Sequence, residues 1–346
     1  MSKLIASLEP AAQAFDPAPM LGGKFVNTVP TNVMGSARAP RMIRRLLFER
    51  RRGDPKEPIG PFRTDVSAYI KPPLDGLRVT WLGHSALLLE IDGFKILTDP
   101  VWSERASFVS FAGPKRFYPP TLALRELPPL DAVLLSHDHY DHLDRATIEQ
   151  LAILLKDDRT RFVASLGLRK NLESWGVLSH SITELNWGQS ITLGPDCSIT
   201  ATPARHFSGR SLWGRNETLW SSFVIRGPRH NIFFGGDSGM FPGFRAIGGA
   251  HGPFDLTMLE IGAYDADWPD VHMGPIHAAQ AHLELRGKWL LPIHWGLFNL
   301  AFHPWREPIE RLMKVAREKN VSLFLPSPGA PHDVTGETAQ TFWWEL

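Results

Sequence analysis

Residues 136–144 carry the sequence SHDHYDHLD, which gathers three histidines and three aspartates directly after an apolar run. Imidazole nitrogens and carboxylate oxygens are the ligands that zinc and its transition-metal neighbours take in proteins. The spacing His-x-His-x-Asp-His lets a tight turn divide these side chains between two adjacent ions. The stretch therefore predicts a metal centre. Solvated loop histidines are the weaker interpretation, because chance clusters rarely follow a strand so directly.

Composition and charge are those of a soluble enzyme. The chain has 346 residues, 43% of them hydrophobic, which permits one large domain or two ordinary ones. Lys and Arg number 37 against 36 Asp and Glu, so we expect no nucleic-acid partner. The single cysteine, Cys197, excludes an intrachain disulfide and fits a reducing compartment. The apolar run Leu4–Leu8 is too short for a secretory signal or a membrane span, so we expect a cytoplasmic protein.

Two regions of different composition divide the chain. Residues 1–75 are rich in Pro, Gly and Arg and predict an N-terminal extension packed on the core, whereas short apolar runs from Leu77 predict a hydrolase domain over 76–346. We expect strands at 78–82, 86–91, 95–98, 132–135, 161–164, 198–202, 218–225, 231–234, 256–261, 289–293 and 322–325. We expect helices at 39–52, 145–155, 168–174, 277–286 and 307–319. Two series of strands with helices between them predict an α/β sandwich.

Further ligand types follow later strands one by one. His206 comes after the expected strand 198–202, Asp237 follows 231–234 within a glycine-rich turn, and His294 follows 289–293. Any one of these alone is an ordinary hydrogen-bonding residue at a strand end. Their order along the chain predicts that they meet the 136–144 stretch at a common site.

At this point the chain resembles the metallo-β-lactamase superfamily and, within it, the N-acylphosphatidylethanolamine-hydrolysing phospholipase D family. Beyond the metal motif, the resemblance is carried by six short segments: Trp81–His84, Leu97–Pro100, Gly113–Phe117, Glu126–Pro129, Gly252–Asp255 and Ile261–Tyr264. It implies an αββα sandwich of two mixed β-sheets flanked by helices. By position, it assigns His137, His139 and His206 to a first metal, Asp141, His142 and His294 to a second, and Asp237 to a bridge between them.

The expected cofactors are two divalent metal ions. Zinc is the default, with iron and manganese as alternatives, because His and Asp ligands suit all three. Such a pair lowers the pKa of a bridging water, so hydroxide becomes available for hydrolysis near neutral pH. Asp141 is expected to bind metal and orient that hydroxide. The resemblance places His84 and His272 near the metals: His84 contacts ligands or substrate, or is a core histidine, and His272 lines the pocket, with proton transfer to the leaving group as a second role.

The expected partner is a small-molecule or lipid-like substrate. The predicted helix Ala39–Arg52 sets apolar side chains against six arginines, a pattern that would allow peripheral contact with the inner face of an anionic membrane. A helix docked on its own protein gives the same pattern, and we favour that interpretation. The sequence does not determine the oligomeric state.

Three functions are carried forward. The first is a dinuclear metal phosphodiesterase of phospholipase D type, acting on N-acyl phosphatidylethanolamine-like or other phosphodiester substrates. The second is a carboxylic ester, lactone or amide hydrolase on the same metal site, because the segments 265–271 and 297–305 depart from the family pattern beside the expected pocket. The third is a metal-bound, non-catalytic binding module. Retention of all seven ligand positions argues against the third.

Overall fold

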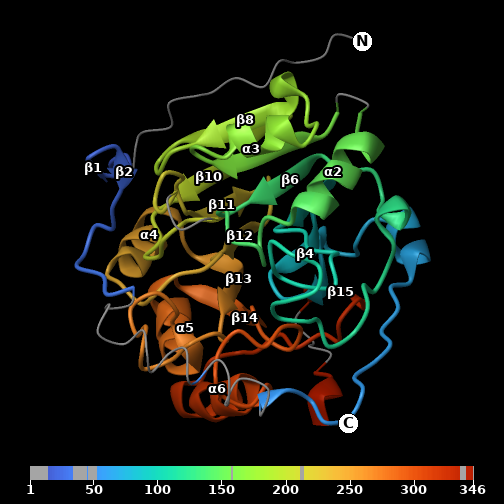
Figure 1. Ribbon diagram of the computed structural model, residues 1–346. Helices are drawn as coiled ribbons and strands as arrows, with labels where there is room; N and C mark the ends of the chain where they lie inside the picture. Colours follow the sequence, from blue (N-terminus) through green and yellow to red (C-terminus); the bar gives the residue numbers. More distant parts are fainter. Residues whose placement is uncertain are drawn as a thin grey trace.

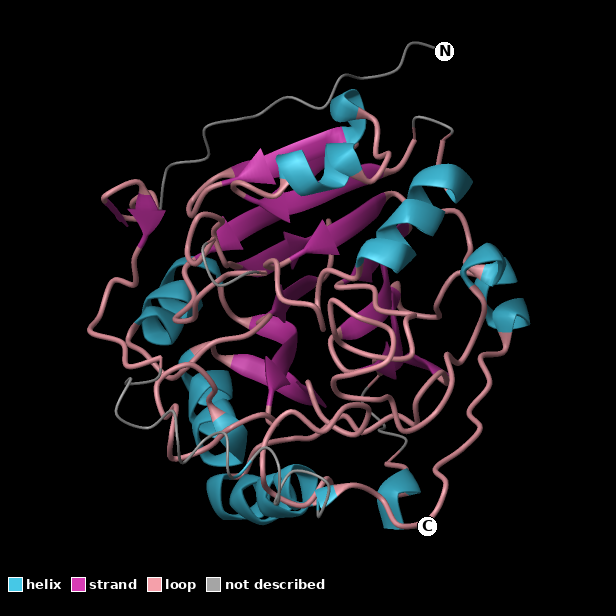
Figure 2. Cartoon of the chain, in the orientation of Figure 1, coloured by secondary structure: helices cyan, strands magenta, loops and turns pink. Residues whose placement is uncertain are grey.

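In the computed structural model, two β-sheets face each other between layers of helices, with α2 (Arg145–Leu154) and α3 (Arg169–Ser174) on one side (Figures 1 and 2). The helices α4 (Gly243–His251), α5 (Gly274–Glu284) and α6 (Glu307–Lys319) lie on the other. The structure describes residues 15–33, 45, 53–156, 159–210, 214–335 and 340–345. The fold is therefore the expected α/β sandwich. In these ranges, no helix combines the length and hydropathy that crossing a bilayer requires.

The first sheet has the strand order β15-β3-β4-β5-β6-β7-β8. Its strands are β15 (Pro331–Asp333), β3 (Leu77–Gly83), β4 (Ala86–Ile91), β5 (Phe94–Thr98), β6 (Ala132–Leu135), β7 (Arg161–Ser165) and β8 (Ile182–Leu185). The second sheet has the order β14-β13-β12-β11-β10-β9. Its strands are β14 (Gly287–Ile293), β13 (Phe254–Glu260), β12 (Asn231–Phe234), β11 (Ser222–Arg226), β10 (Cys197–Thr202) and β9 (Ser190–Leu193). A separate hairpin pairs β1 (Met20–Leu21) with β2 (Lys24–Phe25).

Side chains of the first sheet alternate between two apolar clusters, one on each face of the sheet. Val79 and Leu89 belong to the cluster that packs against the second sheet, whereas Leu88 and Val133 belong to the cluster that includes Leu151 of α2. Successive side chains of a strand point to opposite faces, so a strand that is buried on both faces must be apolar throughout. This is why these strands read as continuous apolar runs in the sequence.

The helix α4 was missed by the sequence analysis. Glycines at positions 243, 248 and 249 lower its helix propensity, so the pattern gave no helix signal. In the structure, a Cβ at Gly248 would lie 2.1 Å from the backbone oxygen of Glu284. The glycine therefore permits close packing of α4 on α5, and tertiary contact outweighs the poor propensity.

Two strand predictions were wrong in extent. Residues 322–325 form only an isolated bridge, Leu290 to Leu323, because the next hydrogen bond of that ladder would need an N–H from Pro292, which has none. The strand expected over 218–225 begins at Ser222, since the Leu219 and Ser221 amides bond to Leu166 and Ser136 instead. Strands β8, β9 and β15, together with the hairpin, were not expected at all.

The N-terminal extension contacts the core in its described parts. Phe25 is buried, and its backbone N–H donates to the Asn216 carbonyl. The expected helix 39–52 lies outside the described residues except for Arg45, which pairs with Asp265 and Asp267 at 2.7 and 2.6 Å. Its proposed membrane contact and the domain boundary near residue 75 stay predictions.

Candidate metal centre

All the residues predicted for the site except His272 lie just beyond the carboxyl ends of strands, and His272 lies in the connection between β13 and α5. His84 follows β3, residues 137–142 follow β6, His206 follows β10, Asp237 follows β12 and His294 follows β14. In open and sandwiched sheets, ligands bind to the loops that follow the carboxyl ends of the strands. His84 and His294 have positive φ angles of 55° and 61°, a conformation that costs free energy in non-glycine residues and is found often at functional sites.

The first group of ligand atoms comprises His137, His139, His206 and Asp237, whose candidate atoms all lie within 4.8 Å of one another. Nδ1 of His139 faces Nε2 of His137 at 2.9 Å and Nε2 of His206 at 3.2 Å. His206 donates its Nδ1–H to the Val271 carbonyl at 2.9 Å, which leaves Nε2 with a lone pair directed to this group. Three imidazole nitrogens that converge in this way fit a divalent cation.

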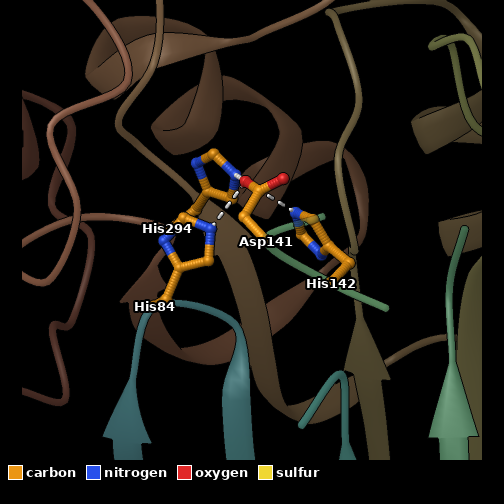
Figure 3. A group of neighbouring side chains, drawn as sticks. All are labelled: His84, Asp141, His142 and His294. Carbon is orange, nitrogen blue, oxygen red and sulfur yellow. Dashed lines mark hydrogen bonds and ion pairs between the residues drawn. The ribbon is translucent and has the colours of Figure 1, made fainter. Parts of the chain in front are cut away.

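The second group comprises His84, Asp141, His142 and His294, drawn in Figure 3. Oδ2 of Asp141 lies 2.9 Å from Nε2 of His84 and 3.2 Å from Nε2 of His294. Burial lowers the pKa of His84 to about 3, so this imidazole is neutral and donates one hydrogen bond to the carboxylate. The Asp141 side chain retains 14% exposure and is therefore accessible from outside.

Asp237 lies between the two groups. Its Oδ2 is 3.2 Å from Nε2 of both His142 and His294, and 3.9 and 3.8 Å from Nε2 of His137 and His206. Burial alone would raise the pKa of the Asp237 carboxyl, but His142 and His294 outweigh it and hold this pKa well below its usual range. One carboxylate thus faces four imidazoles from both groups, which is the position of a bridging ligand.

Several atoms of the site fit a metal better than a proton. Within the described ranges, His142 Nε2 and Asp237 Oδ1 are buried without a hydrogen-bond partner, although buried polar atoms are normally paired. Burial lowers the pKa of His137 and His206 well below the usual value and keeps them neutral, the form that binds metal. The donor set therefore suits two divalent cations.

Asp99 orients one of these imidazoles, that of His142. Its Oδ2 lies 2.7 Å from Nδ1 of His142 and 2.5 Å from the Ser136 hydroxyl, and its Oδ1 accepts the Ser136 amide at 2.8 Å. A carboxylate on the far nitrogen of a ligating imidazole fixes its tautomer and ring orientation. Asp99 therefore fixes the orientation of His142.

The two ligand-bearing loops are locked together. Arg210 donates from Nη1 to the carbonyls of Asp138 and Leu143, at the two ends of the histidine-rich turn, and the Tyr140 hydroxyl donates back to the Arg210 carbonyl. The Arg210 guanidinium also lies 4.1 Å from the centre of the Tyr140 ring. These bonds connect the turn at 137–142 to the loop that carries His206.

The N-terminal extension also supports His206. The Asn27 side chain donates to the His206 carbonyl at 2.8 Å and accepts the His206 amide at 3.1 Å. Nothing in the local sequence around Asn27 predicts this contact, because its partner lies 179 positions away along the chain.

Sequence reasoning missed Glu260, which ends β13 and is fully buried beside His272. Its Oε2 lies 2.6 Å from Nδ1 of His272, and its Oε1 accepts the Ser238 amide at 2.8 Å. The available signal was a lone charged residue closing an otherwise uncharged strand end, Leu256 to Leu259. His272 itself lies at the site, with Nδ1 3.9 Å from Oδ2 of Asp237.

Comparison with known proteins agrees with this geometry. Residues 95–295 match the family model described as a beta-lactamase superfamily domain, which covers more than half of the chain. The chain therefore belongs to the metallo-β-lactamase superfamily, as expected, with relatives that resemble N-acylphosphatidylethanolamine-hydrolysing phospholipase D. It is a metal-dependent hydrolase, and its histidine and aspartate groups indicate divalent metal binding.

Three relatives illustrate the range of similarity. An uncharacterized protein of Mycobacterium tuberculosis is 44% identical over 94% of this chain and 86% of its own length. N-acyl-phosphatidylethanolamine-hydrolyzing phospholipase D 1 of Caenorhabditis elegans is 39% identical over 70% of this chain and 71% of its own length. The structure of Igni18, a metallo hydrolase from Ignicoccus hospitalis, shares the fold with a TM-score of 0.57 at 22% identity, over 74% of this chain and 97% of that one.

Proposed function

We propose that the chain is a dinuclear phosphodiesterase of phospholipase D type, acting on N-acyl phosphatidylethanolamine-like or other phosphodiester substrates. His137, His139 and His206 would hold one ion and Asp141, His142 and His294 the other, with Asp237 between them. The observation that carries this proposal is the position of Asp237 Oδ2, within 3.9 Å of Nε2 of four imidazoles. Zinc is the metal we propose.

When bound, two divalent ions act as Lewis acids and make hydroxide available from water near neutral pH. The protein residues then orient the reactants. His84 fixes the Asp141 carboxylate through Oδ2, so the exposed side of that carboxylate can accept a hydrogen bond from the attacking water. Asp99 and Arg210 hold the ligand turn in place, so little reorganisation is needed during the reaction.

Arg210, a cation in contact with the ligand turn, favours a phosphodiester over a carboxylic ester. Arg210 lines a cavity of about 480 Å³ that also includes Phe108, Tyr140 and Trp175. Its guanidinium donates to the backbone carbonyls of Asp138 and Leu143. A guanidinium at this cavity suits the negative charge of a phosphodiester, and the aromatic rings suit an apolar substituent. The relative from Caenorhabditis elegans points the same way.

The test is a parallel hydrolysis screen of purified protein of known metal content. Bis(p-nitrophenyl) phosphate, N-acyl phosphatidylethanolamine, acyl esters and lactones are compared, with Asp237→Asn as the metal-deficient control. We expect turnover of phosphodiesters that disappears in the control. Turnover of carboxylic substrates alone would refute the phosphodiesterase.

A further inference from the structure

The side chains of Glu260 and His272 form a buried carboxylate–imidazole pair at the edge of the metal centre. The Glu260 side chain is fully buried, whereas that of His272 retains 13% exposure. Nδ1 of His272 lies 2.6 Å from Oε2 of Glu260. In the described parts of the chain, Nε2 of His272 is not one of the buried atoms that lack a hydrogen-bond partner, and Glu260 faces Nδ1, so the exposed part of the ring includes Nε2.

The other oxygen of Glu260 is already engaged. Oε1 accepts the backbone N–H of Ser238 at 2.8 Å, the residue that follows Asp237, and lies 3.4 Å from the Met273 amide. Both oxygens are therefore committed to the protein, and the carboxylate links the Asp237 loop to the His272 loop. A carboxylate in this state supports its neighbours and is poorly placed to ligate an ion itself.

The His272 ring lies close to the ligand groups. Its centroid is 5.1 Å from that of His206 and 5.5 Å from that of His294, imidazoles that we assign to different ions. A substrate whose scissile bond lies between the two groups would thus have His272 beside it. His272 is outside the two groups that we assign to ions and belongs to a third group of candidate ligands, with Asp237, Glu260 and His294. Its Nδ1 already pairs with Glu260, so Nε2 is the nitrogen available to the substrate.

We propose that Glu260 is a positioning residue that accepts Nδ1–H of His272, fixes the orientation of the ring and stabilises its doubly protonated form, so that Nε2–H of His272 serves the leaving group. This proposal rests on the proposed hydrolysis and names the residues that complete it. Water forms the new bond to the reacting centre, and the bond to the leaving oxygen breaks. The leaving oxygen keeps the electron pair of that bond and takes the Nε2 proton. The imidazole regains a proton from the attacking water, so protons and electrons balance.

Proton donation by His272 predicts that the rate loss in variants depends on how stable the leaving group is as an anion. An alkoxide needs a proton as it departs, whereas p-nitrophenolate is a stable anion that departs without one. Glu260→Gln keeps an oxygen for the Ser238 amide but turns an N–H toward Nδ1 of His272, so the ring loses the negative charge that stabilises its doubly protonated form. Loss of a general acid typically costs about 10²–10⁴-fold in rate, and loss of an orienting partner about 10–100-fold.

The experiment compares wild type, Glu260→Gln, His272→Gln and the double variant, all with measured metal content. The matched control is Glu284→Gln, which removes a carboxylate of α5 that pairs with Gln280 and Arg245. On N-acyl phosphatidylethanolamine, we expect kcat to fall by about 10–100-fold in Glu260→Gln. On bis(p-nitrophenyl) phosphate we expect little change. The double variant should be no slower than His272→Gln, because Glu260 acts through that ring.

Three outcomes would overturn the proposal. They are equal losses on both leaving groups, additive losses in the double variant, and loss of bound metal in Glu260→Gln, which would make Glu260 a ligand or a structural support. If wild type cleaves no phosphodiester, the proposed function fails. The same variants are then compared on aryl and alkyl carboxylic esters, where the same leaving-group contrast decides the role of Glu260.

Discussion

Replacement of Asp99 by Asn tests the metal centre through a residue that does not face the substrate. Asp99 is fully buried, and its Oδ2 lies 2.7 Å from Nδ1 of His142 and 2.5 Å from the Ser136 hydroxyl. In Asp99→Asn, Oδ1 still accepts the Ser136 amide, but an NH₂ group replaces Oδ2 and faces two donors. The His142 ring then loses the acceptor that fixes its tautomer.

The magnitude follows from these contacts. Loss of the partner of a ligating imidazole costs about 10–100-fold in metal affinity, or about 1.4–2.8 kcal/mol. Loss of one hydrogen bond to a charged group lowers the free energy of unfolding by about 1.5–3 kcal/mol. We therefore expect Asp99→Asn to fold, to melt earlier than wild type and to release metal at lower chelator concentration.

The assay is metal content per chain by atomic emission across a chelator titration, together with thermal unfolding of the metal-free protein. Asp92→Asn is the matched control, because Asp92 also pairs with a histidine Nδ1, that of His230 at 2.8 Å, and its side chain is 2% exposed. Asp92→Asn should lose stability but keep its metal. Wild-type metal retention in Asp99→Asn, or equal metal loss in both variants, would refute the reasoning.

Three further predictions concern support of the fold and the site. Asn27→Ala removes two hydrogen bonds to the His206 backbone, so about one metal per chain should be released first in a chelator titration, and loss of both ions together would contradict this. Gly262→Ala would place a Cβ 2.2 Å from the His294 carbonyl oxygen and should lower the free energy of unfolding by about 1–3 kcal/mol in urea titrations, whereas an unchanged midpoint would show that the loop adapts. Burial lowers the pKa of His282 to about 4. Its neutral form is thus favoured by folding, and stability is lost as pH falls from about 6.5 toward 4, by about 2 kcal/mol at pH 5. His282→Gln should reduce the difference between urea midpoints at pH 7.5 and pH 5, and an undiminished difference would assign the acid sensitivity to other groups.

Local sequence patterns predicted most of the strands near the site. The runs that became β4, β6 and β12 were predicted with their observed bounds, because a strand buried on both faces is apolar at every position. The prediction failed where a long-range partner decided the outcome. Residues 322–325 have a strand-like composition, but Pro292 in the neighbouring strand cannot continue the ladder.

The candidate ligands also divide into those that the local sequence groups together and those that only the fold brings to the site. Residues 137–142 are close in sequence, so their spacing alone indicates that they share a site. His206, Asp237 and His294 were expected from their positions at strand ends, and the structure places them around the turn. The central position of Asp237 is a tertiary result, because it depends on how the two sheets meet.

What the sequence determined by itself is therefore the ligand turn, the apolar strands and the superfamily. Only the tertiary structure decided that Glu260 supports His272 and that Asn27 supports His206. The physical reason is the range of the interactions. Strand periodicity and turn spacing act between neighbours in the chain, whereas hydrogen bonds of about 3 Å between distant segments exist only after the sheets have packed.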